Sequence, residues 1–190
     1  YQTAFILGSS LTLAFAAIGR SLFPNFSALL SEGKLEKSAK RYSEGIRWSL
    51  IISVAPFSYI IIYPKTSLIM LFGSSYVGAS ISLVIILIGP ISSIIFGPGT
   101  AIVKANGDTR YVLVVYLLAI VGNIICNVLL VPTIGIEGAA IGTTAAMSVQ
   151  AFLLFVRSRS ILNLKLPYLM MSRIFISGAV AGVVFTLMPY

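Results

Sequence analysis

The chain contains no histidine, a single cysteine and only five carboxylates among its 190 residues. Without histidine, the chain cannot form imidazole metal sites or Ser/His and Cys/His nucleophile pairs. Cys126 has no partner for an intrachain disulfide, and the sequence contains no G-x-x-x-x-G-K-[ST] phosphate loop. The sequence therefore predicts neither an enzyme nor a protein with a bound metal or cofactor.

Charged side chains are also scarce, at 9% of residues, whereas they make up about a quarter of a soluble domain. Hydrophobic residues make up 58%, and the mean hydropathy is +1.02. This composition predicts a membrane protein. The net charge of +8 does not indicate a nucleic-acid partner, because the basic residues lie between long apolar runs, where membrane topology accounts for them.

The apolar runs predict an all-α, polytopic membrane helix bundle in a single domain covering residues 1–190. A bilayer core of about 30 Å requires roughly 20 apolar residues in a helix, and about six segments qualify. They cover about 3–31, 47–64, 77–103, 111–131, 138–156 and 171–189.

Lysine and arginine concentrate on alternate connections, which predicts the orientation of the spans because basic residues favour the cytoplasmic side. Lys65 is the one basic residue on the other set of connections. The first span should therefore run from outside to inside, and Glu137 should lie outside. The basic residues of the predicted cytoplasmic connections are Lys34, Lys37, Lys40, Arg41, Arg47, Lys104, Arg110, Arg157, Arg159, Lys165 and Arg173.

The first of these connections, 33–46, predicts an amphipathic helix. Leu35, Ala39, Tyr42 and Ile46 follow one another at spacings of four, three and four residues, which gives a narrow apolar stripe. We expect this helix to lie in the inner membrane interface, with its basic residues toward anionic headgroups. It is either a solvated linker that fixes topology or a regulatory, lipid-sensing element.

Polar and small residues form a pattern around a predicted hairpin. Asn123 and Asn127 share one face of an apolar helix, and Pro132 and Gly135 mark the turn. On the returning helix, Gly138 and Gly142 form a small-xxx-small ridge that would allow close helix packing. A second ridge, Gly178 and Gly182, occurs in the last predicted span.

The pattern N-x-x-x-N-x-x-L-V-P-x-x-G-x-x-G-A-A resembles the carboxyl-terminal region of polysaccharide-biosynthesis flippases, in the multidrug, oligosaccharidyl-lipid and polysaccharide exporter superfamily. The resemblance covers about residues 1–160 and is clearest at Leu71–Ala79, Ala105–Arg110 and Asn123–Ala140. It implies that the chain is one lobe of a two-lobed bundle, and that a cavity between the lobes holds the anionic headgroup of a lipid-linked glycan. Because the chain begins at Tyr1 and supplies about six spans, we expect a fragment of a longer protein.

Arg20 lies about 18 Å from the cytoplasmic end of the first predicted span, near the bilayer centre. A charge at that depth costs at least about 2.5 kcal/mol and therefore needs a partner or water. Arg20 either pairs with backbone carbonyls or an acidic residue outside the chain, or lines a cavity that attracts a phosphate or carboxylate.

The polar side chains Asn25, Asn123, Asn127 and Gln150 are further candidate substrate-binding residues. For the amides at 123, 127 and 150 the alternatives are hydrogen bonds to a substrate or hydrogen bonds between helices. Asn25, next to Pro24, could instead satisfy backbone groups released by a kink.

Two functions from different classes follow. In the first, the chain is the carboxyl-terminal part of a flippase that moves a lipid-linked oligosaccharide or polysaccharide precursor across the cytoplasmic membrane. Its partners would then be membrane lipids, the lipid-linked glycan and a missing amino-terminal lobe. In the second, the chain is a non-transporting membrane module, or a truncated fragment, that packs against a partner membrane protein. A cation-coupled drug exporter lacks support, because no carboxylate is predicted at membrane depth.

Overall fold

The computed structural model describes residues 21–163, and every element within that range is helical. The elements are a helix over 21–31, α2 (Leu35–Ile62), α3 (Pro64–Phe72), the 3-10 helix η1 (Ser74–Ala79), α4 (Ser80–Phe96), α5 (Gly99–Ala105), α6 (Thr109–Ile134) and α7 (Ile136–Leu162). Arg20, Gly178, Gly182, the sixth predicted span and most of the first lie outside the described residues.

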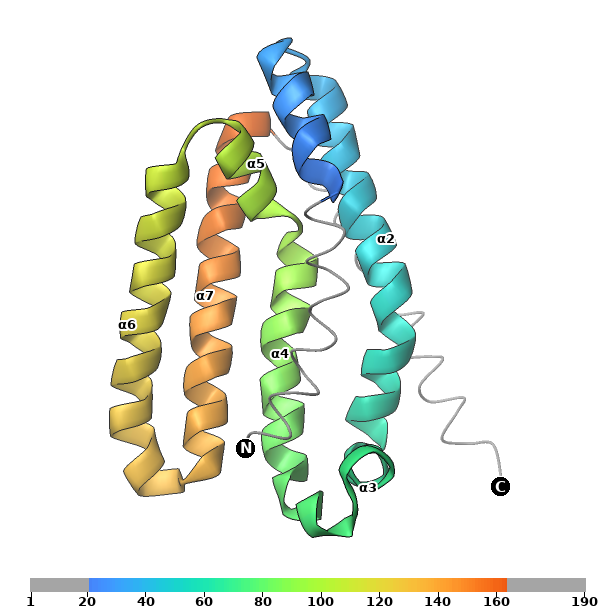
Figure 1. The fold of residues 1–190 in the computed structure, drawn as a ribbon, viewed down its shortest axis with the longest axis vertical. Helices are drawn as coiled ribbons and strands as arrows, with labels where there is room; N and C mark the ends of the chain where they lie inside the picture. The colour runs from blue at the N-terminus through green and yellow to red at the C-terminus, as the bar shows by residue number, and fades with distance from the viewer. Residues whose placement is uncertain (1–20, 164–190) are drawn as a thin grey trace.

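Four segments of the described chain are long and apolar enough to cross a membrane: α2, η1 together with α4, α6 and α7. These long helices lie side by side in the order α6, α7, α4, α2 (Figure 1). The predicted all-α membrane helix bundle is confirmed, and the chain is a multi-pass membrane protein. The basic connections before α2, between α5 and α6, and at the end of α7 gather at one end of the bundle (Figure 1). The α3 region and the α6–α7 turn lie at the other end.

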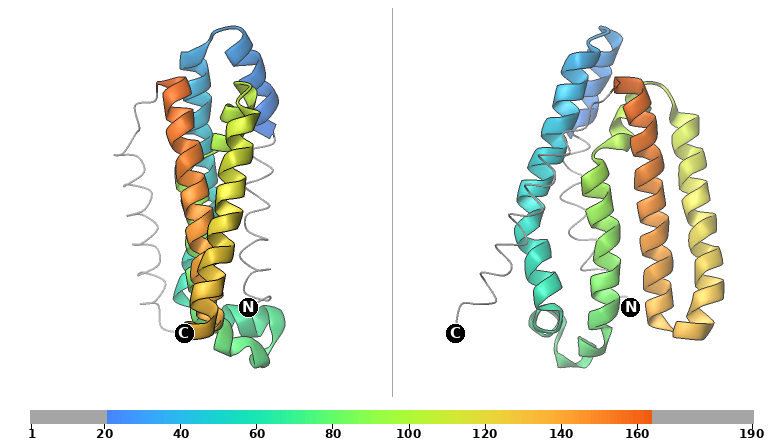
Figure 2. Two further views of the ribbon diagram at one scale, coloured as in Figure 1. Left: turned by 90° about the vertical axis from the view of Figure 1, so that its left-hand side faces the viewer. Right: turned by 180° about the vertical axis from the view of Figure 1, so that it is seen from behind.

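The region 33–64 differs from the expected interfacial helix followed by a span. The structure has one continuous helix of 28 residues, α2, because no proline separates the two expected elements. Gly45 is helical, and a Cβ there would lie 2.8 Å from Leu22 Cδ1 of the preceding helix. At 1.5 Å per residue α2 is about 42 Å long, more than the roughly 30 Å hydrocarbon core. Its basic first turns therefore continue the span axis (Figure 2) instead of lying in the membrane plane.

The expected third span, 77–103, is interrupted at Gly97 and Pro98, between α4 and α5. Gly97 has φ +74°, a conformation that residues with a Cβ rarely adopt, and Pro98 has no N–H to continue the helix. Side chains from other helices satisfy carbonyls at this break. The Tyr42 hydroxyl of α2 donates to the carbonyl of Phe96. The Ser158 hydroxyl of α7 shares its one proton between the carbonyl of Leu154 at 2.8 Å and that of Gly99 at 3.2 Å.

The predicted hairpin also differs in its turn. Pro132 lies inside α6, and the turn consists of Gly135 alone, with φ +61°. Near the end of a helix proline removes only one backbone hydrogen bond, and the Thr133 hydroxyl bonds to the Leu130 carbonyl at 2.9 Å. α7 consequently begins at Ile136, two residues before the expected start of the fifth span.

The main hydrophobic core lies where α2, α4 and α7 meet, and it includes Leu50, Leu83 and Ala140. α6 contributes little to any core, because only Val112 and Val115 are buried on it. Most of its other apolar side chains are exposed, as expected for a helix that faces lipid tails along much of its surface. α6 is therefore fixed to the bundle mainly through α7.

Candidate functional site

The two asparagines of α6 face the glycine ridge of α7. Asn127 Nδ2 donates to Asn123 Oδ1 at 2.9 Å, so the two amides pair along one face of α6. A Cβ built on Gly142 would lie 3.0 Å from Asn127 Oδ1 and 3.5 Å from Asn123 Oδ1. The absence of a side chain at Gly142 thus allows the backbone of α7 to approach both amides.

Asn127 Oδ1 is buried and accepts no conventional hydrogen bond in the described part of the chain. The Cα–H bond of Gly142 that takes the place of a Cβ points toward this amide oxygen, the arrangement of the weak Cα–H···O contacts that recur at helix interfaces. This geometry favours the helix-packing interpretation of the asparagines. Both residues remain half-buried, so a part of each is still accessible from outside the interface.

Gly138 makes the tighter contact of the ridge. A Cβ at this position would lie 2.6 Å from both the carbonyl carbon and the carbonyl oxygen of Leu130. Backbone atoms cannot move aside as a flexible side chain can, so no larger residue fits without separating α6 from α7. The approach of the two helices is closest at their shared turn.

The remaining candidate amides are not brought together with this pair by any contact in the structure. Asn25 is exposed on the helix over 21–31, and Gln150 is half-buried on α7. Neither forms a hydrogen bond to another described residue. Within residues 21–163 the polar candidates therefore do not converge on one pocket, and no group of three or more His, Cys, Asp or Glu side chains lies close enough to hold a metal ion.

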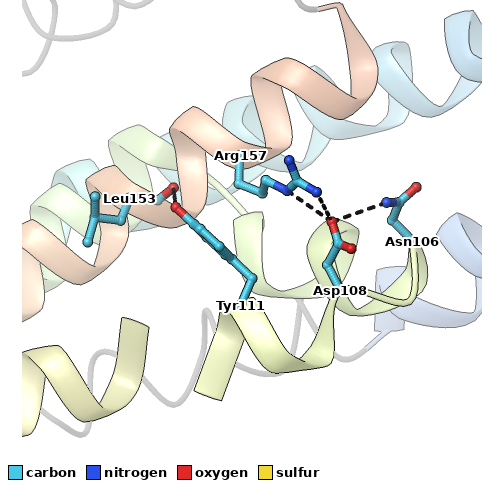
Figure 3. Close-up of polar contacts among 5 residues, drawn as sticks. All are labelled: Asn106, Asp108, Tyr111, Leu153 and Arg157. Carbon is cyan, nitrogen blue, oxygen red and sulfur yellow. Dashed lines mark hydrogen bonds and ion pairs between the residues drawn. The ribbon is translucent and has the colours of Figure 1, made fainter. Parts of the chain in front are cut away.

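A polar cluster that was not predicted from the sequence lies where the α5–α6 connection meets α7 (Figure 3). Asp108 Oδ2 accepts two hydrogen bonds from Arg157, from Nε at 2.9 Å and from an η nitrogen at 2.6 Å. Asn106 Nδ2 donates to the same oxygen at 3.3 Å. Asp108 occupies the residue before α6 but makes no side-chain cap, because its carboxylate is turned to α7.

Tyr111 extends the cluster. Its ring centroid lies 5.7 Å from the Arg157 Cζ atom, within the range of a cation–π contact. Its hydroxyl donates to the carbonyl of Leu153 at 3.2 Å, one turn before Arg157 on α7. The first turn of α6 is therefore joined to the last turns of α7 by an ion pair, an aromatic contact and a hydrogen bond, and we call these four side chains, Asn106, Asp108, Tyr111 and Arg157, the polar clasp.

The opposite charges of Asp108 and Arg157 cancel within the polar clasp, which limits its attraction for a charged substrate. The Asp108 side chain is 27% exposed and that of Arg157 41% exposed, and each satisfies the charge of the other. Such a pair holds two helices in register more readily than it attracts a substrate anion. From the sequence alone Arg157 counts only as a topological charge, because 49 residues separate it from Asp108. The available signal was a lone carboxylate on a connection otherwise rich in cations.

A comparison with described protein families finds no match for the chain. A search of curated proteins finds that the chain is 25% identical over 186 residues to a probable low-salt glycan biosynthesis flippase, Agl15, of Haloferax volcanii. The matched region covers 97% of this chain and 39% of that protein, so the chain spans well under half the length of its relative. The likeness, distant but nearly continuous along the chain, relates this multi-pass helical membrane protein to the flippases.

Proposed function

We propose that the chain is the carboxyl-terminal part of a flippase that translocates a lipid-linked oligosaccharide or polysaccharide precursor across the cytoplasmic membrane. The observation that carries the proposal is the match to a probable glycan biosynthesis flippase along 97% of the chain. The four apolar helices support it, since a lipid carrier must be moved by a protein that itself spans the bilayer.

In this proposal the described helices form the wall of one lobe. The α6–α7 hairpin is a unit closed at both ends, by Gly138 against Leu130 at the turn and by the polar clasp at the opposite end. A unit held in this way moves as one body, which suits the rocking of two lobes that the family resemblance implies. Arg20 and the accessible parts of Asn25, Asn123, Asn127 and Gln150 are the residues we propose to contact the glycan lipid.

The test uses a strain that lacks the complete gene. We expect loss of the surface glycan and accumulation of its lipid-linked precursor, both restored by the complete protein. Unchanged surface glycan together with an unchanged precursor pool would contradict the proposal. If the deletion instead removes another membrane protein from the membrane while precursors turn over normally, the chain acts as a packing module.

Arg20 provides the test of mechanism, because a cavity arginine binds phosphate through its fork and a lysine offers only a point charge. We expect Arg20→Ala to abolish glycan export and Arg20→Lys to retain part of it, both measured at equal protein levels. Lys65→Ala removes one exposed positive charge from the predicted outer connection and serves as the matched control. Undiminished export by Arg20→Ala at a normal protein level would refute the headgroup role and leave carbonyl pairing.

A further inference from the structure

One face of α2 is exposed along most of its length, and its chemistry changes with depth. Lys40, Arg47, Trp48, Ile51, Ile52 and Tyr59 are exposed and fall within one side of the helix at about 100° per residue. We call them the α2 stripe. The opposite side carries Tyr42, Ile46, Leu50 and Phe57, all buried in the bundle core.

The apolar part of the α2 stripe is as long as one leaflet is thick. Trp48 and Tyr59 are eleven residues apart, which corresponds to about 16 Å along the helix, and half of the hydrocarbon core is about 15 Å. Trp48 is 59% exposed, and tryptophan favours the boundary between headgroups and tails. Lys40 and Arg47 are then at headgroup level or beyond it.

Neither positive charge of the α2 stripe has an ion-pair partner among the described residues. In the described structure Lys40 and Arg47 form no ion pair, and Glu44, which lies between them, is bonded to Arg41 at 3.1 Å. Glu32 pairs with Lys34, and Asp108 with Arg157. All five carboxylates of the sequence lie within the described range, so residues 1–20 and 164–190 contribute no acidic side chain. The remaining two, Glu36 and Glu137, form no ion pair with Lys40 or Arg47 in the described structure, so both basic side chains are available to an anion from outside this chain.

We propose that the α2 stripe binds an anionic phospholipid of the surrounding bilayer. Lys40 and Arg47 hold the headgroup phosphate, Trp48 lies at the level of the glycerol backbone, and an acyl chain runs along Ile51, Ile52 and Tyr59. Charge complementarity selects an anionic lipid over a second helix of this chain, because residues 164–190 carry only basic charges. The inference holds whether the protein is a flippase or a packing module.

Trp48 is the one tryptophan of the sequence and reports on this position directly. The complete protein, with any tryptophan outside residues 1–190 replaced by phenylalanine, is placed in bilayers containing brominated phosphatidylglycerol or brominated phosphatidylcholine. Bromine quenches tryptophan fluorescence on contact, so the two quenching curves give the relative affinity of the site for each lipid. We expect about a fivefold or greater preference for phosphatidylglycerol. The attraction of a single basic residue to an anionic headgroup already corresponds to about a fivefold difference in affinity, and the stripe has two such residues.

Three variants separate a specific site from general attraction. K40Q/R47Q should reduce the preference to about one. K104Q/R110Q removes the same charge from exposed positions at the same end of the bundle and should leave the preference unchanged. K40R/R47K keeps the charges and should keep the preference, and an unshifted Trp48 emission maximum checks folding.

Equal quenching of the unsubstituted protein by both lipids would overturn the proposal. An equal loss of preference in K104Q/R110Q would also overturn it, because the effect would then be one of surface potential. Absence of quenching by either lipid would show that protein covers the stripe. A preference for the lipid-linked glycan over phosphatidylglycerol, measured by competition, would assign the stripe to the substrate instead.

Discussion

Breaking the ion pair of the polar clasp is expected to destabilise the contact between α6 and α7. Fully exposed pairs contribute about 0.2 to 1 kcal/mol, and removal of one partner from a buried pair costs about 3 to 5 kcal/mol. The Asp108 carboxylate is 27% exposed and the Arg157 side chain 41% exposed, so this pair falls between the two cases. We therefore expect a coupling free energy of about 1 to 2 kcal/mol, since the hydrogen bonds are charge-assisted but partly screened by water.

The measurement is a double-mutant cycle on the complete protein, with Asp108→Asn, Arg157→Gln and the combination. The free energy of unfolding is followed by denaturing-detergent titration in mixed micelles. The cycle isolates the interaction from the other effects of each substitution. A second cycle on Arg41 and Glu44 serves as the control, because these side chains are 61% and 39% exposed and three residues apart on α2.

The control pair should show a coupling of only about 0.2 to 0.5 kcal/mol, and added salt should weaken it proportionally more. A coupling of Asp108 and Arg157 no larger than that of the control would show that the polar clasp does not stabilise the α6–α7 contact. An unchanged unfolding free energy in Arg157→Gln alone would show the same, because removal of the partner of a half-buried carboxylate should be destabilising.

Two further perturbations test the packing and the topology. Gly142→Leu should lower the unfolding free energy by roughly 1 to 3 kcal/mol through overpacking against Asn127. Gly122→Leu on α6 should not lower it, because a Cβ at Gly122 meets nothing within 4 Å. Equal effects of the two substitutions in a detergent titration would contradict the close approach of α7 to α6 at Gly142. In a background without Cys126, a cysteine at position 37 should react with impermeant reagents only from the cytoplasmic side and one at position 137 only from outside, and labelling with the opposite sidedness would invert the topology.

Local sequence was sufficient for the class of the protein and for several of its details. Long apolar runs leave no alternative to helices in a bilayer, because every backbone polar group must be satisfied within its own segment. The spacing of Gly138 and Gly142 indicated a close helix contact, and Gly135 marked the turn, since positive φ favours glycine. The likeness to flippases also comes from the sequence, through short motifs and through a match that extends over 186 residues.

Tertiary structure decided what depends on partners distant in sequence. The expected interfacial helix is part of α2, and Gly45 within it packs against Leu22 of the preceding helix, a contact between residues 23 positions apart that helical periodicity does not predict. At the break around Gly97, hydroxyl groups of α2 and α7 donate hydrogen bonds to backbone carbonyls. The hydrophobic periodicity of the sequence does not predict these contacts between distant helices. The pairing of Asp108 with Arg157 spans 49 residues. The sequence shows that both side chains are charged, but only the packing of α6 on α7 brings them within hydrogen-bonding distance.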